Sequence, residues 1–317
     1  MKVLVTELMW DDGIEELKRN GYSVDYDMEL SRKRSELLEL APAYDALIVR
    51  NETKVDAELL DAAINTKVIG RLGVGLDNID LDAAKARNMP VIPAIHANAT
   101  SVAEYVMASM LDAYRPLAEA DADVRQGNWD RKFFTGYELN RKTLGLVGMG
   151  EIAHRVAKRA NAFGMNIMGY DPFVKPFDHI LAETGVRPVE TLDELLTHSD
   201  FVSIHVPLTK ATRHMISKDN FECMKHHAYV INSARGGIVH EQDLVEAVQS
   251  GEIAGAYLDV LETEPVQKGS PLSKVESIHL SPHIAGLTDE SQSRTAMLVA
   301  REVMKVLEGG KSLCAVV

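Results

Sequence analysis

The sequence feature that most limits the possible folds is a glycine-rich turn between an apolar stretch and a helical pattern. Residues 144–147 are apolar or glycine, and Gly148 and Gly150 follow them just before Ile152 and Ala153. The first glycine permits a tight turn, the second lets a phosphate approach bare backbone, and Ala153 keeps the helix close to the sheet. The helix N-terminus offers unpaired N–H groups and a partial positive charge. The pattern therefore predicts a strand–turn–helix unit that binds a dinucleotide.

The position of Asp171 indicates which dinucleotide is bound. This residue follows the next predicted strand, about 20 residues beyond the second glycine. A carboxylate there accepts hydrogen bonds from the adenosine ribose and repels a 2′-phosphate. Pro172 and Phe173 follow it, with no arginine cluster to bind such a phosphate. NAD is the predicted cofactor, and the alternative is a structural turn with an incidental aspartate.

Strand–helix alternation predicts parallel sheets in both halves of the chain. Strands are expected at residues 2–6, 23–26, 46–49, 68–70, 90–92, 143–147, 167–170, 201–205, 229–232, 255–259 and 278–280. Helices are expected at residues 14–19, 31–40, 56–64, 81–86 and 288–308. Ser101 and Glu104 have the spacing of a capping box, which predicts one long helix over residues 105–120.

Length, charge and cysteine content exclude several classes of protein. A chain of 317 residues is expected to form two domains. A formal net charge of −13 argues against nucleic-acid binding, and no run of about 18 apolar residues predicts a membrane-spanning helix. The N-terminus is interpreted as a first strand rather than a secretory signal. Cys223 and Cys314 cannot form a disulfide framework, which fits a reducing cytoplasm, and neither has the spacing of metal ligands.

Three short segments in the last third of the chain contain candidate catalytic residues. Arg235 lies beside Gly236, Glu264 precedes a proline, and His283 follows a proline. An arginine can hold a carboxylate through two parallel hydrogen bonds, and a histidine oriented by a glutamate can move a proton near neutral pH. Such groups suit a 2-hydroxy or 2-keto acid. The alternative is that Arg235 is a salt-bridge partner and that Glu264 has no special role.

With these motifs, the chain resembles the D-isomer-specific 2-hydroxyacid dehydrogenases over nearly its whole length. Residues 70–80 and 98–104 also match the family. The branch that it resembles is the phosphoglycerate dehydrogenase-like one, without the C-terminal regulatory domain that many of its members carry. The resemblance implies an α/β protein with two Rossmann-like, doubly wound parallel-sheet domains. A discontinuous substrate (catalytic) domain is expected at residues 1–98 plus 288–317, and an NAD-binding domain at residues 99–287.

The resemblance also implies an activity and a set of site residues. The activity is NAD-dependent hydride transfer at C2 of a small anionic acid of the phosphoglycerate, glycerate/hydroxypyruvate or sulfolactate type. Arg235 would bind the carboxylate, and His283 with Glu264 would act as acid and base. The implied cofactor contacts are Gly148, Met149, Gly150, Glu151, Ile152, Asp171, His205, Val206, Pro207, Thr212, Ser233, Ala234, Asp259, His283 and Gly286. The implied substrate contacts are Arg50, Asn51, Arg71, Val74, Gly75, Arg235 and His283, with no metal.

Two residues depart from the family pattern. Glu151 stands where many relatives have arginine, and a carboxylate there should weaken phosphate binding unless it pairs with Arg155 one turn further along the helix. Asn51 stands where serine is frequent, which leaves the identity of the acid open. Arg50 and Arg71 are either substrate ligands or buried structural cations.

The resemblance implies a homodimer joined through the NAD-binding domain, with the helix after Ser101 and the loop around Trp129 at the interface. The alternative function is that of a non-catalytic, NAD-sensing scaffold like the C-terminal-binding-protein corepressors, which share the fold and the Arg–Glu–His set.

Overall fold

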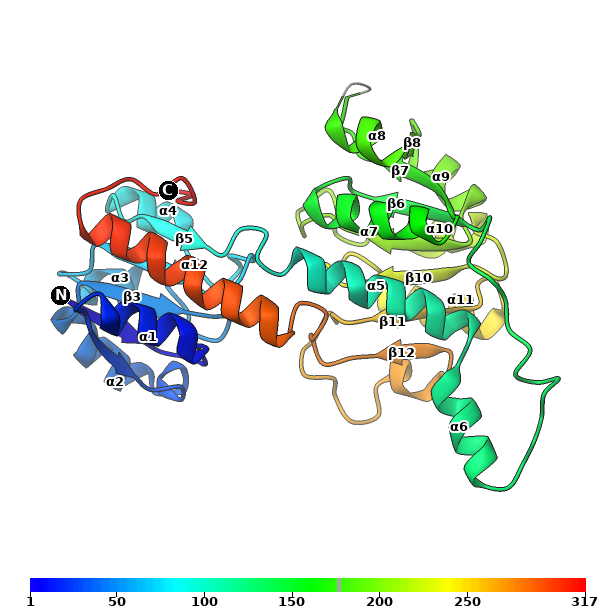
Figure 1. Ribbon diagram of the computed structural model, residues 1–317, viewed down its shortest axis with the longest axis horizontal. Helices are drawn as coiled ribbons and strands as arrows, with labels where there is room; N and C mark the ends of the chain where they lie inside the picture. Colours follow the sequence, from blue (N-terminus) through cyan, green and yellow to red (C-terminus); the bar gives the residue numbers. More distant parts are fainter. Residues whose placement is uncertain (176–177) are drawn as a thin grey trace. The chain divides into compact units, whose positions relative to one another are not determined.

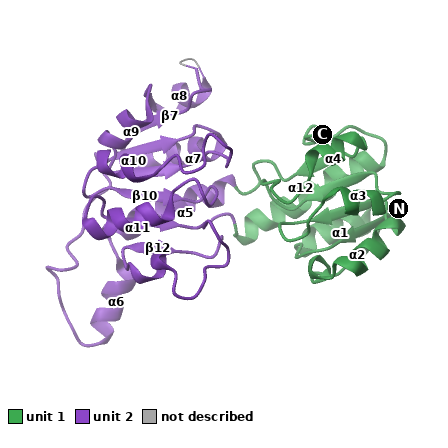
Figure 2. Cartoon of the chain, turned by 180° about the vertical axis from the view of Figure 1, so that it is seen from behind, with its two compact units in different colours: residues 1–98, 287–317 green, residues 99–286 purple. Residues whose placement is uncertain are grey.

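The computed structural model describes residues 1–175 and 178–317, which form two compact units. Unit 1 consists of residues 1–98 and 287–317, and unit 2 consists of residues 99–286 (Figure 2). Each unit contains one parallel sheet with helices on both of its faces. The predicted fold class, α/β with two Rossmann-like parallel sheets, is confirmed.

Unit 1 is built on a five-stranded parallel sheet with the strand order β2-β1-β3-β4-β5. The strands are β1 (Lys2–Val5), β2 (Ser23–Tyr26), β3 (Ala46–Val49), β4 (Val68–Arg71) and β5 (Val91–Pro93). The helices are α1 (Asp11–Arg19), α2 (Arg34–Leu40), α3 (Ala57–Ala62), α4 (Leu81–Ala86) and α12 (Asp289–Leu307), with short 3₁₀ turns η1 (Leu30–Arg32) and η2 (Ala41–Ala43).

Both faces of this sheet are buried, because successive strand residues point to opposite sides. Val3 and Val5 pack with residues of α1 and α12, whereas Leu4 packs with residues of α2 and α3. Helix α12 lies beside α1 although the two are separated by most of the chain (Figure 1). The C-terminal segment therefore completes one face of the N-terminal sheet.

Unit 2 is built on a seven-stranded parallel sheet with the strand order β12-β11-β10-β9-β6-β7-β8. The strands are β6 (Thr143–Val147), β7 (Asn166–Tyr170), β8 (Arg187–Pro188), β9 (Phe201–Ile204), β10 (Tyr229–Asn232), β11 (Gly255–Leu258) and β12 (Ile278–Leu280). The helices are α5 (Ala99–Tyr114), α6 (Leu117–Arg125), α7 (Glu151–Ala162), α8 (His179–Thr184), α9 (Leu192–His198), α10 (Lys218–Cys223) and α11 (Glu241–Ser250), with a 3₁₀ turn η3 (Pro271–Lys274). Helices α5 and α7 cover one face, and α9, α10 and α11 cover the other.

The prediction of one helix over residues 105–120 is wrong. Helix α5 begins at Ala99, so Ser101 lies inside its first turn and is 4% exposed, and Glu104 pairs with Arg159 of α7 at 3.0 Å. The helix ends at Tyr114, just before Pro116, whose ring removes a backbone donor. A second helix, α6, then starts at Leu117.

The helix predicted over residues 31–40 is also divided. Lys33 adopts φ −113° and ψ 63°, which are not helical values, and separates η1 from α2. Other elements agree with the prediction to within a few residues. The helices α8 to α11 and the strand β8 were not predicted.

Within the described residues, no helix is both long enough and apolar enough to span a membrane.

Candidate functional site

The glycine turn joins β6 to α7 at the carboxyl edge of the sheet in unit 2. Gly148 has φ 88°, and a Cβ atom there would lie 2.8 Å from the carbonyl oxygen of His205. Only glycine fits this position. Gly150 caps α7, and no atom lies within 4 Å of the place where its Cβ would be. The backbone at the start of α7 is therefore open to a ligand.

Asp171 follows β7, next to the glycine turn. Its carboxylate accepts a hydrogen bond from the Met149 N–H at 2.9 Å and another from the Phe173 N–H at 2.9 Å. These bonds fix a half-buried carboxylate beside the open backbone. In dinucleotide-binding domains, a carboxylate at this position accepts hydrogen bonds from the adenosine ribose of NAD.

His205 follows β9 and lies against the glycine turn. Burial lowers the pKa of His205 to about 4, so the imidazole is neutral at physiological pH. The ring nitrogen Nε2 lies 3.0 Å from the Ser203 hydroxyl oxygen. The side chain of Val206 lies 2.8 Å from the place where a Gly148 Cβ would be. His205 and Val206 therefore pack directly against one side of the glycine turn.

The hydroxyl group of Thr212 has a local role in the structure. It donates a hydrogen bond to the Pro207 carbonyl at 2.6 Å and accepts one from the Thr209 N–H at 2.8 Å. Thr212 therefore closes the loop that follows β9.

Glu151 forms the ion pair that the sequence indicated. Its Oε1 lies 2.7 Å from Arg155 Nη2 and 2.8 Å from Arg155 Nε. Arg155 also donates to the Thr100 hydroxyl at 2.8 Å, so the guanidinium is held from both sides. The pair neutralises the carboxylate at the start of α7. The Ile152 side chain packs against the core, which leaves its backbone as the part available to a cofactor.

The loop with Arg235 follows β10 and is shaped by Asn232. The Asn232 amide donates to the Arg235 carbonyl at 2.9 Å and accepts from the Ala234 N–H at 3.1 Å. Arg235 Nη1 donates to the Ala234 carbonyl at 2.6 Å. Between them, the Ser233 hydroxyl is buried and has no hydrogen-bond partner within the described residues. A buried hydroxyl of this kind is suited to a ligand.

The Arg235 loop touches the loop with Glu264. A Cβ atom at Gly236 would lie 1.8 Å from the Leu261 carbonyl oxygen. Only glycine at position 236 therefore allows the two loops to approach this closely. The Glu264 loop is also held to the start of α11. The Glu262 N–H donates to the Glu241 carboxylate at 2.6 Å, and the Glu241 N–H donates to the Glu262 carboxylate at 3.2 Å.

His283 and Glu264 form a hydrogen-bonded pair. Nδ1 of His283 lies 2.9 Å from Oε2 of Glu264, and Oε1 of Glu264 accepts from the Leu261 N–H at 3.0 Å. The side chains are 53% and 40% exposed. The bond at Nδ1 fixes the orientation of the ring and leaves Nε2 as the nitrogen that can exchange a proton with a substrate.

The backbone of His283 adopts φ 56°, a region that side-chain-bearing residues seldom occupy. Asp259, which follows β11 and is 1% exposed, stabilises this loop. Its carboxylate accepts from the Ser281 hydroxyl at 2.6 Å, the Ile284 N–H at 2.8 Å and the Ala285 N–H at 2.7 Å. Asp259 was predicted as a cofactor contact, and both of its oxygens bind the His283 loop.

Sequence reasoning missed the residue that extends this network to α5. The Tyr105 hydroxyl lies 2.7 Å from the Ser281 hydroxyl, so a chain of hydrogen bonds runs from Tyr105 through Ser281 to Asp259. Gly286 lies in the same loop. No local pattern marks a tyrosine for this contact, because its partner is 176 residues away.

The predicted substrate contacts of unit 1 also gather at the carboxyl edge of one sheet. Arg50 and Asn51 follow β3, Arg71 is the last residue of β4, and Val74 and Gly75 lie in the loop after it. Arg71 Nη1 donates to the Leu72 carbonyl at 3.2 Å, and a Cβ atom at Gly73 would lie only 1.5 Å from this nitrogen. Gly73 is therefore required for the position of the Arg71 side chain. Val74 is 43% exposed.

The parallel sheet, the open glycine turn and the placed carboxylate of Asp171 define unit 2 as a dinucleotide-binding domain of the kind found in oxidoreductases. Within the described residues, no group of three or more His, Cys, Asp or Glu side chains is placed to hold a metal ion.

Comparisons with known proteins agree with this description. A family model described as "D-isomer specific 2-hydroxyacid dehydrogenase, NAD binding domain" matches residues 107–285. The chain is 44% identical to D-3-phosphoglycerate dehydrogenase of Archaeoglobus fulgidus over 98% of this chain and 58% of that protein. It is 42% identical to (S)-sulfolactate dehydrogenase of Chromohalobacter salexigens over 96% of this chain and 98% of that protein. The crystal structure of the TT0316 protein from Thermus thermophilus superposes with a TM-score of 0.91 at 34% identity, with 100% of both chains covered.

The chain belongs to the D-isomer specific 2-hydroxyacid dehydrogenase family, and unit 2 contains the NAD-binding domain of that family. The predicted family and cofactor are confirmed. The chain spans only 58% of the length of the archaeal phosphoglycerate dehydrogenases that it matches.

Proposed function

We propose that this chain is an NAD-dependent oxidoreductase that transfers a hydride between the nicotinamide ring and C2 of a small anionic 2-hydroxy or 2-keto acid. The names of its relatives support acids of the phosphoglycerate and sulfolactate type. Another relative, from Thermotoga maritima, is named hydroxypyruvate reductase and is 42% identical over 89% of its length. Each of these acids has a carboxylate, an adjacent C2 carbon that can be oxidised or reduced, and a further polar group.

The observation that carries the proposal is the contact of 2.9 Å between His283 Nδ1 and Glu264 Oε2. It lies at the carboxyl edge of the same sheet as the glycine turn, where ligands of such sheets bind. An oriented histidine at the same sheet edge as a dinucleotide site is what a proton-coupled hydride transfer needs.

In this proposal, each member of the set has a defined task. Arg235 binds the carboxylate of the acid and orients its C2 oxygen. His283 gives a proton from Nε2 to that oxygen during reduction, or takes it during oxidation. Glu264 keeps the ring in place and stabilises its protonated form.

The residues of unit 2 fit NAD. The backbone at Gly148, Met149, Gly150, Glu151 and Ile152 would hold the pyrophosphate, because no side chain fills the space at Gly150 or caps the first turn of α7. Asp171 would bind the adenosine ribose. The remaining contacts would come from residues that follow β9, β10, β11 and β12, namely His205, Val206, Pro207, Thr212, Ser233, Ala234, Asp259, His283 and Gly286. When bound, NAD supplies or accepts the hydride.

Unit 1 would be the substrate (catalytic) domain, with contacts from Arg50, Asn51, Arg71, Val74 and Gly75. Three arginines in the proposed substrate set support an acid with a second anionic group. The charge of these arginines would offset the formal net charge of −13, which otherwise repels anions.

We also propose a cytoplasmic homodimer joined through unit 2. Leu117 of α6 and Trp129 and Phe133 of the loop after it are 71%, 76% and 72% exposed. Large apolar side chains exposed along one segment of the chain favour a protein interface. The two cysteines, Cys223 and Cys314, are both free, which suits a reducing compartment.

The test is a screen of keto acids by NADH absorbance, with phosphohydroxypyruvate, hydroxypyruvate, sulfopyruvate, oxaloacetate and glyoxylate. We expect reduction of at least one acid, and a loss of about 100-fold or more in kcat/KM for His283→Ala and for Arg235→Ala, with NADH affinity kept. Full activity in either variant would contradict the assigned roles. Tight NADH binding without turnover on any acid would instead support the scaffold alternative.

A further inference from the structure

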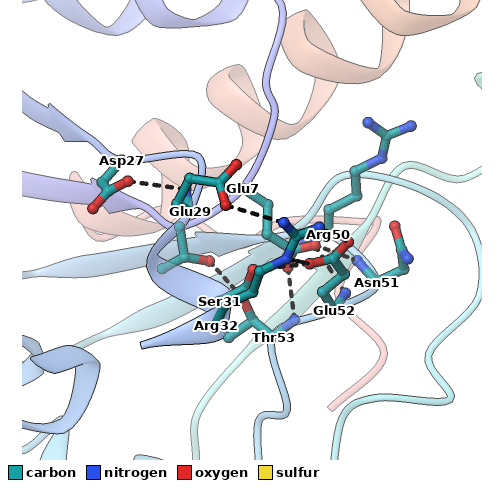
Figure 3. Close-up of polar contacts among 10 residues, drawn as sticks. Glu7, Asp27, Glu29, Ser31, Arg32, Arg50, Asn51, Glu52 and Thr53 are labelled. Carbon is teal, nitrogen blue, oxygen red and sulfur yellow. Dashed lines mark hydrogen bonds and ion pairs between the residues drawn. The ribbon is translucent and has the colours of Figure 1, made fainter. Parts of the chain in front are cut away.

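The segment that follows β3 is bound by one buried carboxylate. Glu7, which is 4% exposed, faces the backbone of residues 50–53 (Figure 3). Its Oε1 accepts from the Arg50 N–H at 2.8 Å and the Thr53 N–H at 2.9 Å. Its Oε2 accepts from the Asn51 N–H at 3.1 Å and the Glu52 N–H at 2.8 Å. Four successive backbone donors thus converge on a single side chain.

This carboxylate is ionised. Burial acts to raise the pKa of Glu7, but the backbone donors outweigh it and the pKa lies below its ordinary value of 4.5. Each oxygen already accepts two hydrogen bonds. Glu7 is therefore a structural anion that shapes this segment rather than a group that titrates near neutral pH.

The carbonyl groups of the same segment are held by a second residue. Asn78, in the loop after β4, donates from Nδ2 to the Arg50 carbonyl at 3.2 Å and to the Thr53 carbonyl at 2.7 Å. The Thr53 hydroxyl also lies 2.8 Å from the Thr6 hydroxyl, and both threonines are fully buried. Residues 6, 7 and 78 therefore fix the segment from the strands on either side of β3.

The outer side of the segment is tied to the turn η1. Glu52 Oε2 accepts from the Ser31 hydroxyl at 3.1 Å and from Arg32 Nε at 3.3 Å, and Arg32 is also held by Glu29 at 3.1 Å (Figure 3). These groups are exposed, so each ion pair contributes little alone. Together they leave the segment little freedom to move.

Two side chains of this fixed backbone have no such partners. Within residues 1–175 and 178–317, neither the Arg50 guanidinium nor the Asn51 amide forms a hydrogen bond or an ion pair inside the protein. Arg50 is half-buried, and burial lowers the pKa of Arg50 against the opposing effect of the Glu7 and Glu52 carboxylates. A half-buried cation without a hydrogen-bond partner, on an immobilised backbone, is preorganised to bind an anion.

We propose that Glu7 is a positioning residue. Its carboxylate, helped by Asn78, holds Arg50 and Asn51 in the arrangement that binds the second anionic group of the substrate, the one remote from C2. This inference rests on the proposed function. It predicts that disturbing Glu7 impairs acids that carry a second anionic group and spares acids that lack it.

The test compares Glu7→Gln with a matched control, Asp45→Asn. Asp45 also joins β1 to β3 through a carboxylate, accepting from the Lys2 N–H at 2.8 Å, but it lies at the amino ends of these strands. In Glu7→Gln the amide offers one acceptor oxygen in place of two, so at least two of the four N–H groups lose their partner.

We expect Glu7→Gln to raise KM for phosphohydroxypyruvate about tenfold or more, with KM for hydroxypyruvate, kcat and the Kd for NADH each changed less than about threefold. Asp45→Asn should leave both KM values unchanged. An equal KM for phosphohydroxypyruvate in wild type and Glu7→Gln would overturn the proposal.

A second measurement separates this inference from the proposed function. Hydrogen exchange should show that the amides of residues 51–53 are protected in the wild type and exchange about 100-fold faster in Glu7→Gln, with β6 unchanged. If the wild type reduces no keto acid, the proposed function fails, and unchanged exchange at residues 51–53 would independently refute the positioning role. If Glu7→Gln does not fold, Asn78→Ala tests the same segment through its carbonyl groups, with the same KM pattern expected.

Discussion

Glu264 binds His283 with one carboxylate oxygen and its own loop with the other. The 2.9 Å contact to Nδ1 orients the imidazole, and the 3.0 Å bond from the Leu261 N–H fixes the carboxylate that orients it. The glutamate is thus placed by the backbone before any substrate binds. Its charge is available to stabilise a protonated ring.

The first prediction concerns that charge. Glu264→Gln keeps the size of the side chain but removes the charge that stabilises protonated His283. We expect kcat for keto-acid reduction to fall about 10- to 100-fold, with the Kd for NADH changed less than about threefold, because the amide no longer stabilises positive charge on the ring. The measurements are steady-state kinetics and a fluorescence titration with NADH. Glu276→Gln, an exposed glutamate of the same unit, is the control. A kcat equal to that of the wild type would show that Glu264 does not act through the ring.

The second prediction concerns the ion pair at the start of α7. Arg155→Ala leaves the Glu151 carboxylate unpaired beside the open backbone, so we expect NADH binding to weaken about fivefold. The double variant Glu151→Ala/Arg155→Ala should bind NADH about as well as the wild type, because no unpaired charge remains. The Kd values are measured by NADH fluorescence. Additive losses in the double variant would contradict this explanation.

The third prediction concerns Asp171. Asp171→Ala should raise the ratio of kcat/KM for NADPH over NADH at least about tenfold, because a 2′-phosphate no longer meets a carboxylate. It should also destabilise the fold by about 1–2 kcal/mol, since the Met149 and Phe173 N–H groups lose their acceptor. Asp171→Asn keeps an acceptor and should change the cofactor ratio with a smaller loss of stability. Coenzyme kinetics and urea denaturation measure the two effects separately.

The fourth prediction concerns His205 and pH. Burial lowers the pKa of His205 from 6.5 to about 4, so the unfolded chain binds a proton in this range that the folded chain does not. Stability should therefore decrease as pH falls from about 6.5 to about 4, by up to about 3 kcal/mol from this group. His205→Gln should lose less stability over the same range. Urea denaturation at pH 7 and pH 4.5 measures the difference, and equal losses in both proteins would refute it.

The parts of the site that could be predicted from the sequence are those set by local patterns. The glycine turn needs only a few neighbouring residues, and Asp171 follows it at a spacing fixed by one helix and one strand. The pairing of Glu151 with Arg155 follows from a separation of one helical turn. In each case, a single strand–helix unit or a single helical turn determines the arrangement.

The contacts that could not be predicted join residues far apart in the chain. Glu7 binds a segment more than 40 residues away, and Tyr105 meets Ser281 across 176 residues. A glutamate after a strand and a tyrosine in a helix are ordinary in isolation, so no pattern marks them. The prediction of a single long helix is wrong because Pro116, which has no backbone N–H, separates α5 from α6, whereas the Ala- and Leu-rich composition continues through both helices.

The packing of α12 against α1 has a consequence for biosynthesis. Residues 99–286 form a continuous compact unit, so all of its internal contacts can form before the C-terminal residues are synthesised. The N-terminal sheet is made earlier but lacks one covering helix until residues 289–307 have been synthesised. The part of the sheet that α12 covers therefore stays exposed while almost two hundred residues are produced, and exposed apolar surface of this kind favours aggregation of the nascent chain.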